Sequence, residues 1–365
     1  MTHQPPTVGF TEAKLERLHA QLADAVATLV TGDWVRALKF AARFRSRSFN
    51  NTVLIWMQRC AAFEQGRVAE PTPTYVAGFR QWQALGRSVD RGQTGYMIFA
   101  PVHARFASPT PEVAESWRRL ARREVPRPND EVRTRMVGVR PAYVWDASQT
   151  SGVPSPHVPV PQLLAGEAPQ GLWDGLESLV RGHGYTLRIV GSDRDLGGAN
   201  GMTDYLTRSV AIRGDIDRAA RTKTLAHELA HVMLHGPDNA DAALHRGIGE
   251  VEAESVALMI GAAHGLDTSD YTTPYVATWA TSVGGKTPVE VVQATGERVR
   301  TTAVTILREL PTLQAGSGDP PGLTGEAHRN ALQPLVAGPV ARFDNVRRVK
   351  VRHSSTDSVI SARDL

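Results

Sequence analysis

Residues 224–234 read TLAHELAHVML, and only His227, Glu228 and His231 in this stretch carry ionisable side chains. Uncharged residues surround these three on almost every side, so the stretch predicts a helix buried in a core. Two histidines and a carboxylate buried there without a partner would cost free energy. A metal ion is their natural partner.

The spacing of these residues indicates what the metal would do. Side chains four residues apart on a helix project from the same face, so His227 and His231 can bind one ion, and Glu228 points into the same site. Catalytic zinc keeps three protein ligands and an open position, where a bound water is acidified and attacks a carbonyl with Glu228 as general base. The pattern predicts a zinc hydrolase. Satisfied core histidines beside a surface ion pair are the alternative.

A third ligand is expected downstream, on another helix. Pro237 stands where the metzincin pattern needs a histidine, which excludes that subclass. Residues 249–260, GEVEAESVALMI, predict a helix on which Glu250 and Glu254 share a face. We expect Glu250 to bind the metal and Glu254 to orient a ligating histidine. Glu252 as ligand, exchanged roles for Glu250 and Glu254, and acids that merely favour a helix start are the alternatives.

Two strands are expected before the metal helix. Residues 185–190 and 208–213 have the composition of strands, and the connection between them is rich in Gly, Asn and Asp. A short sheet here would offer an edge to an extended peptide. The sequence does not decide which residue stabilises the oxyanion; the candidates are Tyr205, His245, His264, Tyr271 and Tyr275.

Charge divides the chain into two unequal halves. Residues 1–150 hold 21 Lys and Arg against 13 acidic residues, a net charge of +8, whereas residues 151–365 hold 20 against 24, a net charge of −4. Aromatic residues are interleaved with arginines in the basic half. Guanidinium groups bind phosphates and exposed rings stack on bases, so this half suits a groove for single-stranded nucleic acid. Core aromatics, and arginine usage that follows a high-GC genome, are the alternative.

The chain is long enough for two domains with cores of their own. We expect an α+β nucleic-acid-binding domain, a Pro-rich linker, a metallopeptidase-like domain and a weakly ordered tail, over residues 10–150, 151–167, 168–310 and 311–365. Apolar spacing predicts helices at 11–31, 33–43, 50–62, 168–182 and 288–310. It predicts further strands near 87–89, 96–101 and 142–146.

The order of these motifs resembles a known family. HELAHVMLH at 227–235, followed by Glu250 and Glu254, resembles the gluzincin-type peptidases of the IrrE/ImmA class and the C-terminal half of ArdC-type antirestriction proteins. Four upstream segments are similar to the N-terminal single-stranded-DNA-binding domain of ArdC: 46–56 (SRSFNNTVLIW), 79–92 (FRQWQALGRSVDRG), 98–101 (IFAP) and 143–150 (YVWDASQT). The resemblance implies a zincin-like (gluzincin) C-terminal domain with zinc and Glu250 as third ligand. Asp90, where a basic residue is common, and residues 102–135, which look like an insertion, depart from the pattern.

Together these observations give one hypothesis: a cytoplasmic, single-stranded-DNA-binding zinc metallopeptidase of the ArdC antirestriction type that hydrolyses peptide bonds. DNA-backbone contacts are expected from arginines at turns and helix edges, namely Arg45, Arg47, Arg80, Arg87 and Arg91. The single cysteine, Cys60, suits a reducing cytoplasm, and no apolar run approaches the ~20 residues that span a bilayer. The alternatives are a DNA-binding protein with a structural or vestigial metal site, and an IrrE-like peptidase that cleaves a transcriptional repressor.

Overall fold

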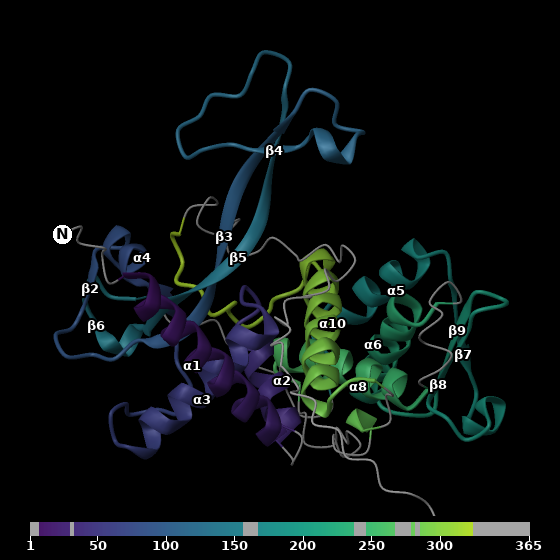
Figure 1. Ribbon diagram of the computed structural model, residues 1–365. Coiled ribbons are helices and arrows are strands. Elements are labelled where there is room, and N and C mark those ends of the chain that lie inside the picture. Colours follow the sequence, from purple (N-terminus) through teal and green to yellow (C-terminus); the bar gives the residue numbers. More distant parts are fainter. Residues whose placement is uncertain are drawn as a thin grey trace, which may run out of the picture. The chain divides into compact units, whose positions relative to one another are not determined.

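The computed structural model describes residues 7–29, 33–155, 167–236, 246–266, 279–281 and 285–323 (Figure 1). All of them belong to one compact unit, Met1–Leu332. Most of the predicted linker and of the predicted tail lie outside the described residues. The architecture is mixed α+β, as the sequence predicts.

Three helices begin the described chain, close to the predicted ranges: α1 (Thr7–Thr28), α2 (Trp34–Arg43) and α3 (Phe49–Glu64). Their apolar faces are buried; Leu18 and Val26 of α1 are fully enclosed, as is Leu38 of α2. The Ser48 side chain caps α3 by accepting a hydrogen bond from the Asn51 N–H.

An antiparallel sheet follows, in the strand order β1-β5-β3-β4. Its strands are β1 (Val76–Gly78), β3 (Tyr96–Ser108), β4 (Arg118–Arg119) and β5 (Glu131–Asp146). Smaller elements accompany it: α4 (Phe79–Ala84), β2 (Arg87–Val89), η2 (Ala114–Ser116), η3 (Ala147–Gln149) and β6 (Thr150–Gly152), which pairs with β2. The strands predicted at 96–101 and 142–146 are the inner halves of β3 and β5. Their outer halves form a long hairpin over the suspected insertion (Figure 1).

Side chains of α3 complete the hydrogen bonding of β3. Asn51 donates to the Phe99 carbonyl and accepts from the Phe99 N–H, both at 2.9 Å. Gln58, two turns further along α3, makes the same two bonds with Met97, at 2.9 and 2.8 Å. Two amides therefore take the place of a neighbouring strand along this edge.

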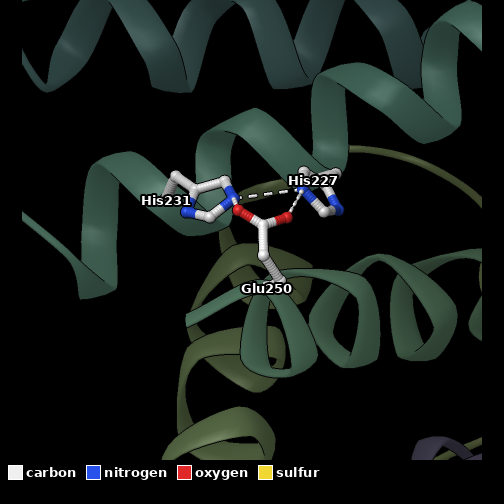
Figure 2. Close-up of side chains that lie close together, drawn as sticks. All are labelled: His227, His231 and Glu250. Carbon is white, nitrogen blue, oxygen red and sulfur yellow. Dashed lines mark hydrogen bonds and ion pairs between the residues drawn. The ribbon is translucent and has the colours of Figure 1, made fainter. Parts of the chain in front are cut away.

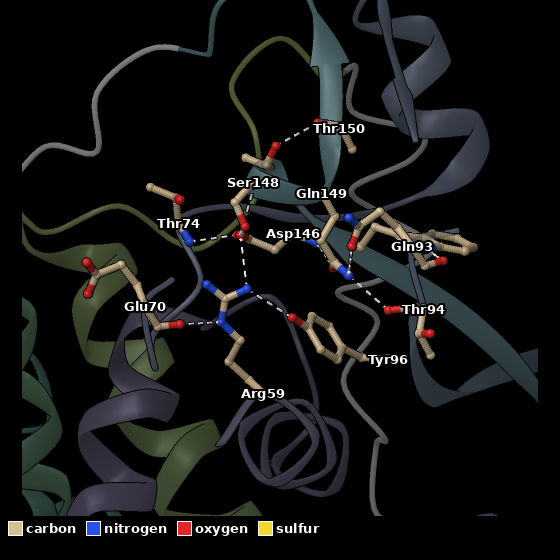
Figure 3. Close-up of polar contacts among 12 residues, drawn as sticks. Arg59, Glu70, Thr74, Gln93, Thr94, Tyr96, Asp146, Ser148, Gln149 and Thr150 are labelled. Atoms are coloured by element: carbon tan, nitrogen blue, oxygen red, sulfur yellow. Dashed lines mark hydrogen bonds and ion pairs between the residues drawn. The ribbon is translucent and has the colours of Figure 1, made fainter. Parts of the chain in front are cut away.

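Arg59, also on α3, lies in the interior (Figure 3). Its side chain is 2% exposed and forms an ion pair at 3.3 Å with Asp146, whose side chain is 0% exposed. Arg59 also donates to the Glu70 carbonyl at 2.7 Å and to the Tyr96 hydroxyl at 3.0 Å. The other carboxylate oxygen of Asp146 accepts from the Thr74 N–H at 2.8 Å. These contacts hold α3, β3, β5 and the segment before β1 together.

The described residues of the second half form a three-stranded sheet and four helices of eleven or more residues. Its elements are α5 (Leu172–Gly182), β7 (Thr186–Val190), η4 (Asp193–Leu196), β8 (Gly201–Asp204), β9 (Ser209–Arg213), α6 (Arg218–Leu234), α8 (Arg246–Ala263) and α10 (Pro288–Glu309). The sheet order is β7-β9-β8, with β7 parallel and β8 antiparallel to β9. The predicted strands at 185–190 and 208–213 are β7 and β9, whereas β8 was not predicted.

Buried residues of both halves pack into one continuous core. A hydrogen bond of 2.9 Å from Trp34 Nε1 of α2 to Ser255 Oγ of α8 joins the halves inside it. Asp217 caps α6 through the Ala220 N–H, so the helix begins nine residues before the first site histidine. Among the described helices, none combines the length and the apolar composition that crossing a membrane requires.

Candidate metal centre

Helix α6 presents the two site histidines on the side that faces α8 (Figure 2). The His227 and His231 Nε2 atoms are 3.1 Å apart. Glu250, in the second turn of α8, reaches between them, with its two carboxylate oxygens each 3.5 Å from one of these nitrogens. The structure therefore brings together the three residues that the sequence suggests as ligands.

The spacing of these atoms fits one divalent ion. One nitrogen or oxygen from each of the three residues lies within 4.8 Å of the other two. Ligand atoms about 2.0–2.2 Å from a tetrahedral zinc ion are about 3.4 Å from one another. The separations of 3.1 and 3.5 Å match that value. Two imidazoles and one carboxylate are also a donor set that zinc accepts.

A carboxylate orients the first histidine. Glu254 Oε2 lies 3.2 Å from His227 Nδ1, and Lys223 Nζ lies 2.9 Å from the other oxygen of Glu254. With Nδ1–H donating to Glu254, it is His227 Nε2, on the side of Glu250, that can lose its proton and offer a lone pair to a metal ion. This placement matches the predicted role of Glu254.

The second histidine is oriented through another histidine. His231 Nδ1 lies 2.9 Å from His235 Nδ1, and His235 Nε2 lies 3.0 Å from Glu252 Oε2. Arg298 Nε donates to the other oxygen of Glu252 at 2.7 Å. Because Glu252 only accepts, His235 carries its proton on Nε2, its Nδ1 accepts from His231, and His231 Nε2 keeps a free lone pair. Glu252 thus acts behind His231 and does not reach the ligand position.

Glu228 lies beside the ligands, buried at 5% exposure. Thr203 of β8 donates its hydroxyl to Glu228 Oε2 at 2.7 Å. A Cβ at Gly201 would lie 2.6 Å from the other carboxylate oxygen, so glycine is needed where β8 passes the site. Burial raises the pKa of Glu228, although the Thr203 hydrogen bond and the nearby histidines oppose the shift. A carboxylate with a raised pKa is suited to accept a proton near neutral pH.

The charges around the histidines favour a cation. Burial lowers the pKa of His227, but hydrogen bonds with Glu250 and Glu254 outweigh burial and raise it from 6.5 to about 9. Hydrogen bonds with His227 and His231 hold the pKa of Glu250 well below its usual value. Negative groups thus converge on the point where the Nε2 atoms meet.

Two of the oxyanion candidates can be placed. The Tyr205 hydroxyl donates to the His231 carbonyl at 3.3 Å, and burial, followed by the charges of Tyr185, Glu228 and Glu250, raises its pKa to about 12. His264 is buried and bonded to the Ile260 carbonyl and the Thr312 hydroxyl. The other candidates, His245, Tyr271 and Tyr275, lie outside the described residues.

Comparison with known proteins finds a family match in the first part of the chain. Residues 13–145 match the family model of the N-terminal domain of anti-restriction factor ArdC. The chain also resembles the metal-free crystal structure of the antirestriction ArdC protein from R388 plasmid, with 17% identity and a TM-score of 0.50 over 79% of this chain and 96% of that one. A Mn(II)-bound structure of the same protein is matched at 17% identity and a TM-score of 0.41, over 73% and 89% of the two chains. No curated protein sequence matches significantly. The fold is therefore similar to that of ArdC.

The arginines predicted to contact DNA separate into two groups within this ArdC-like part. Arg80 and Arg91 are exposed. Arg47 is instead buried, and donates to the Val76 carbonyl at 2.7 Å and to Asp319 at 3.0 Å. Arg45 donates to the Ala42 and Ala315 carbonyls, and Arg87 to Thr150 and the Ala147 carbonyl. The guanidinium groups of Arg45, Arg47 and Arg87 thus hold the chain's own segments together.

Sequence reasoning missed two residues of the centre. Thr203 lies in the Gly-rich connection where no strand was predicted, so no pattern singled it out. His235 stands four residues after His231, and this continued i, i+4 spacing was the signal that could have found it.

Proposed function

We propose that this chain is a zinc-dependent peptidase with a zincin-like C-terminal domain. The observation that carries the proposal is the convergence of His227, His231 and Glu250 at ligand spacing beside the buried carboxylate of Glu228. When bound, zinc would acidify a water molecule and polarise a carbonyl group. Three protein ligands leave a position open for water, whereas a structural zinc site is usually closed by four.

The residues of the centre would divide the chemistry among them. Glu228 accepts the proton of the attacking water on a carboxylate oxygen and returns it to the departing amine. Thr203 keeps that carboxylate in place from the β8 side. Tyr205, with its proton retained up to a pKa of about 12, is the candidate among the described residues to donate to the developing oxyanion.

Strand β8 supplies a place for the substrate. It is an edge strand of the β7-β9-β8 sheet and passes directly over Glu228. An extended peptide that pairs with this edge would bring a carbonyl to the carboxylate. Backbone pairing of this kind favours peptides over compact folded substrates.

The test compares Glu228→Gln with the wild type in cleavage of a library of internally quenched peptides, with zinc content measured on both. We expect the variant to retain zinc and to lose about 10²–10⁴-fold in cleavage rate. Glu177→Gln on α5, whose carboxylate pairs with Arg181, is the matched control and should cleave like the wild type. Cleavage retained by Glu228→Gln would remove Glu228 from the mechanism. A zinc-loaded wild type that cleaves nothing in the library would favour a structural metal.

A second proposed function, antirestriction through binding of single-stranded DNA, rests on the first part of the chain. The match of residues 13–145 to the ArdC N-terminal domain and the net charge of +8 over residues 1–150 support it. Fluorescence anisotropy of the full-length protein with a labelled single-stranded oligonucleotide tests it. Binding should weaken steeply with added salt, and no binding at low salt would contradict this function.

A further inference from the structure

The outer hairpin carries much of the positive charge of the first half. We define the arm as residues 102–140, that is, the outer halves of β3 and β5, strand β4 and the segments between them. The arm contains nine arginines and five acidic residues. Residues 131–138 of β5 are exposed on both faces, so this half of the hairpin is not covered by the rest of the protein.

The strand register gathers four arginines on one face of the arm. Directly paired residues share a face. Arg119 of β4 and Arg133 of β5 both pair with Phe106 of β3. Arg135 and Arg140 pair with other even-numbered residues of β3, and so lie on the same face as Phe106. We call Arg119, Arg133, Arg135 and Arg140 the arginine face.

Aromatic rings hold two of these guanidinium groups. The guanidinium carbons of Arg133 and Arg135 lie 4.7 and 4.8 Å from the centre of the Trp117 ring, and that of Arg135 lies 5.6 Å from the Phe106 ring. Stacking fixes the planes of these groups and leaves their N–H edges able to take phosphate oxygens in pairs. Planar guanidinium and indole surfaces also stack on unpaired bases.

Arg118, on the opposite face of the arm, differs from the arginine face in its ion pairs. Arg118 pairs with Ala107 of β3 and so points to that side, where it forms ion pairs with both Glu124 and Asp130. On the arginine face, Arg133 has an exposed ion pair with Glu131. Arg119, Arg135 and Arg140 form no ion pair with any residue in the described part of the chain. Three arginines of the arginine face therefore have no ion-pair partner in the described part of the chain, whereas Arg118 on the opposite face has two.

We infer that the arginine face of the arm binds single-stranded nucleic acid, with the guanidinium groups on phosphates and unpaired bases against Trp117 and the stacked arginines. The inference rests on the proposed DNA-binding function and names its surface. An acidic protein would complement the charge, but its carboxylates would not stack on the planar indole and guanidinium groups. A duplex hides the faces of its bases, so the aromatic component favours a single strand.

The test measures anisotropy of a labelled single-stranded oligonucleotide bound to the full-length protein, over a range of salt concentrations. The first variant is Arg133→Gln/Arg135→Gln/Arg140→Gln. We expect at least tenfold weaker binding at low salt, and a slope of log K against log salt that is smaller in magnitude by about 2, since each phosphate contact to a single strand contributes about 0.7. Arg105→Gln is the matched control, because this exposed arginine pairs with Thr134 and lies on the opposite face.

Two further variants separate binding from folding of the arm. Arg119→Gln/Arg140→Gln leaves the stacked arginines of Trp117 in place and should still weaken binding. Arg133→Lys/Arg135→Lys keeps the charge but removes the planar forks, and should recover part of the affinity. Unchanged affinity and slope in the triple variant, or an equal loss in Arg105→Gln, would overturn the inference while leaving DNA binding intact. Absence of binding by the wild type would overturn both the inference and the proposed DNA-binding function. If polyglutamate competes as strongly as the oligonucleotide does, the partner of the arginine face is an acidic protein and not DNA.

Discussion

The α6–α8 centre and the interior of the ArdC-like part use charged residues in opposite ways. In the centre, His227, His231 and Glu250 converge around a point that a cation can occupy. The two histidines lie four residues apart on α6, and Glu250 lies on α8. In the ArdC-like part, Arg47 and Arg59 are enclosed and neutralised by Asp319 and Asp146. Arg47 and Arg59 thus serve the fold, whereas the part-buried His227 and His231 and the exposed Glu250 bring their ligand atoms to one point.

The largest effect that tests this contrast is on stability. Arg59→Met should lower the free energy of unfolding by about 3–5 kcal/mol, because Asp146 would remain buried without its ion-pair partner. Urea denaturation followed by circular dichroism measures the change. Arg36→Met is the control, since Arg36 and Asp33 form an exposed pair, and it should cost less than about 1 kcal/mol. A loss below 1 kcal/mol for Arg59→Met would show that the pair is not a structural centre.

The next effect concerns the metal. Glu252→Gln should lower zinc affinity about 10- to 100-fold, because His235 would no longer hold the His231 ring in the ligating tautomer. Competition with a fluorescent chelator at constant pH gives the affinity. Glu297→Gln on α10 also removes a carboxylate from an arginine, Arg300, but touches no site histidine, and should bind zinc like the wild type. Equal affinities for both variants would mean that Glu252 serves only packing.

A third effect is the pH dependence of zinc binding. His227, with a pKa of about 9, carries a proton at neutral pH, and zinc must displace it. Affinity should therefore fall as pH falls, by about tenfold per unit between pH 8 and 7, and should level off above pH 9. Calorimetry in buffers of different ionisation enthalpy should register the released proton. Affinity that is constant from pH 7 to 8 would refute the raised pKa.

The smallest effect on the free energy of unfolding is expected for an exposed arginine of the ArdC-like part. Arg80→Gln should change the free energy of unfolding by less than about 0.5 kcal/mol, because the residue lies on the surface of α4. The urea assay used for Arg59→Met applies. A loss above 1 kcal/mol would show that Arg80 also has a structural role and that exposure does not separate the arginines.

The longer described helices, and the grouping of His227 with His231, could be predicted because their signals are local. The spacing of His227 and His231 and the Thr287-Pro288 start of α10 depend only on neighbouring residues. Strand β8 escaped prediction because four residues in a Gly-rich connection carry no periodicity. The outer half of β5 escaped because it is exposed on both faces and so lacks the alternation that marks a half-buried strand.

The roles of the arginines could not be read from the sequence for a different reason. Arg47 pairs with a residue 272 positions away and Arg59 with one 87 positions away. Local composition marked Arg47 as a residue of a turn beside serines, which is correct for its backbone, but the distant aspartate decides where its side chain goes. Such partners become neighbours only when the chain folds.

The amide pairing of Asn51 and Gln58 with β3 also closes an edge to which another strand could pair. An edge strand with unpaired backbone N–H and C=O groups can pair with a strand of another molecule, and such pairing often begins aggregation. Here the backbone groups of Met97 and Phe99, on the inner half of β3, already bond to side chains of α3. A second copy of the chain therefore finds no free backbone groups at Met97 and Phe99, where the basic hairpin leaves the rest of the sheet.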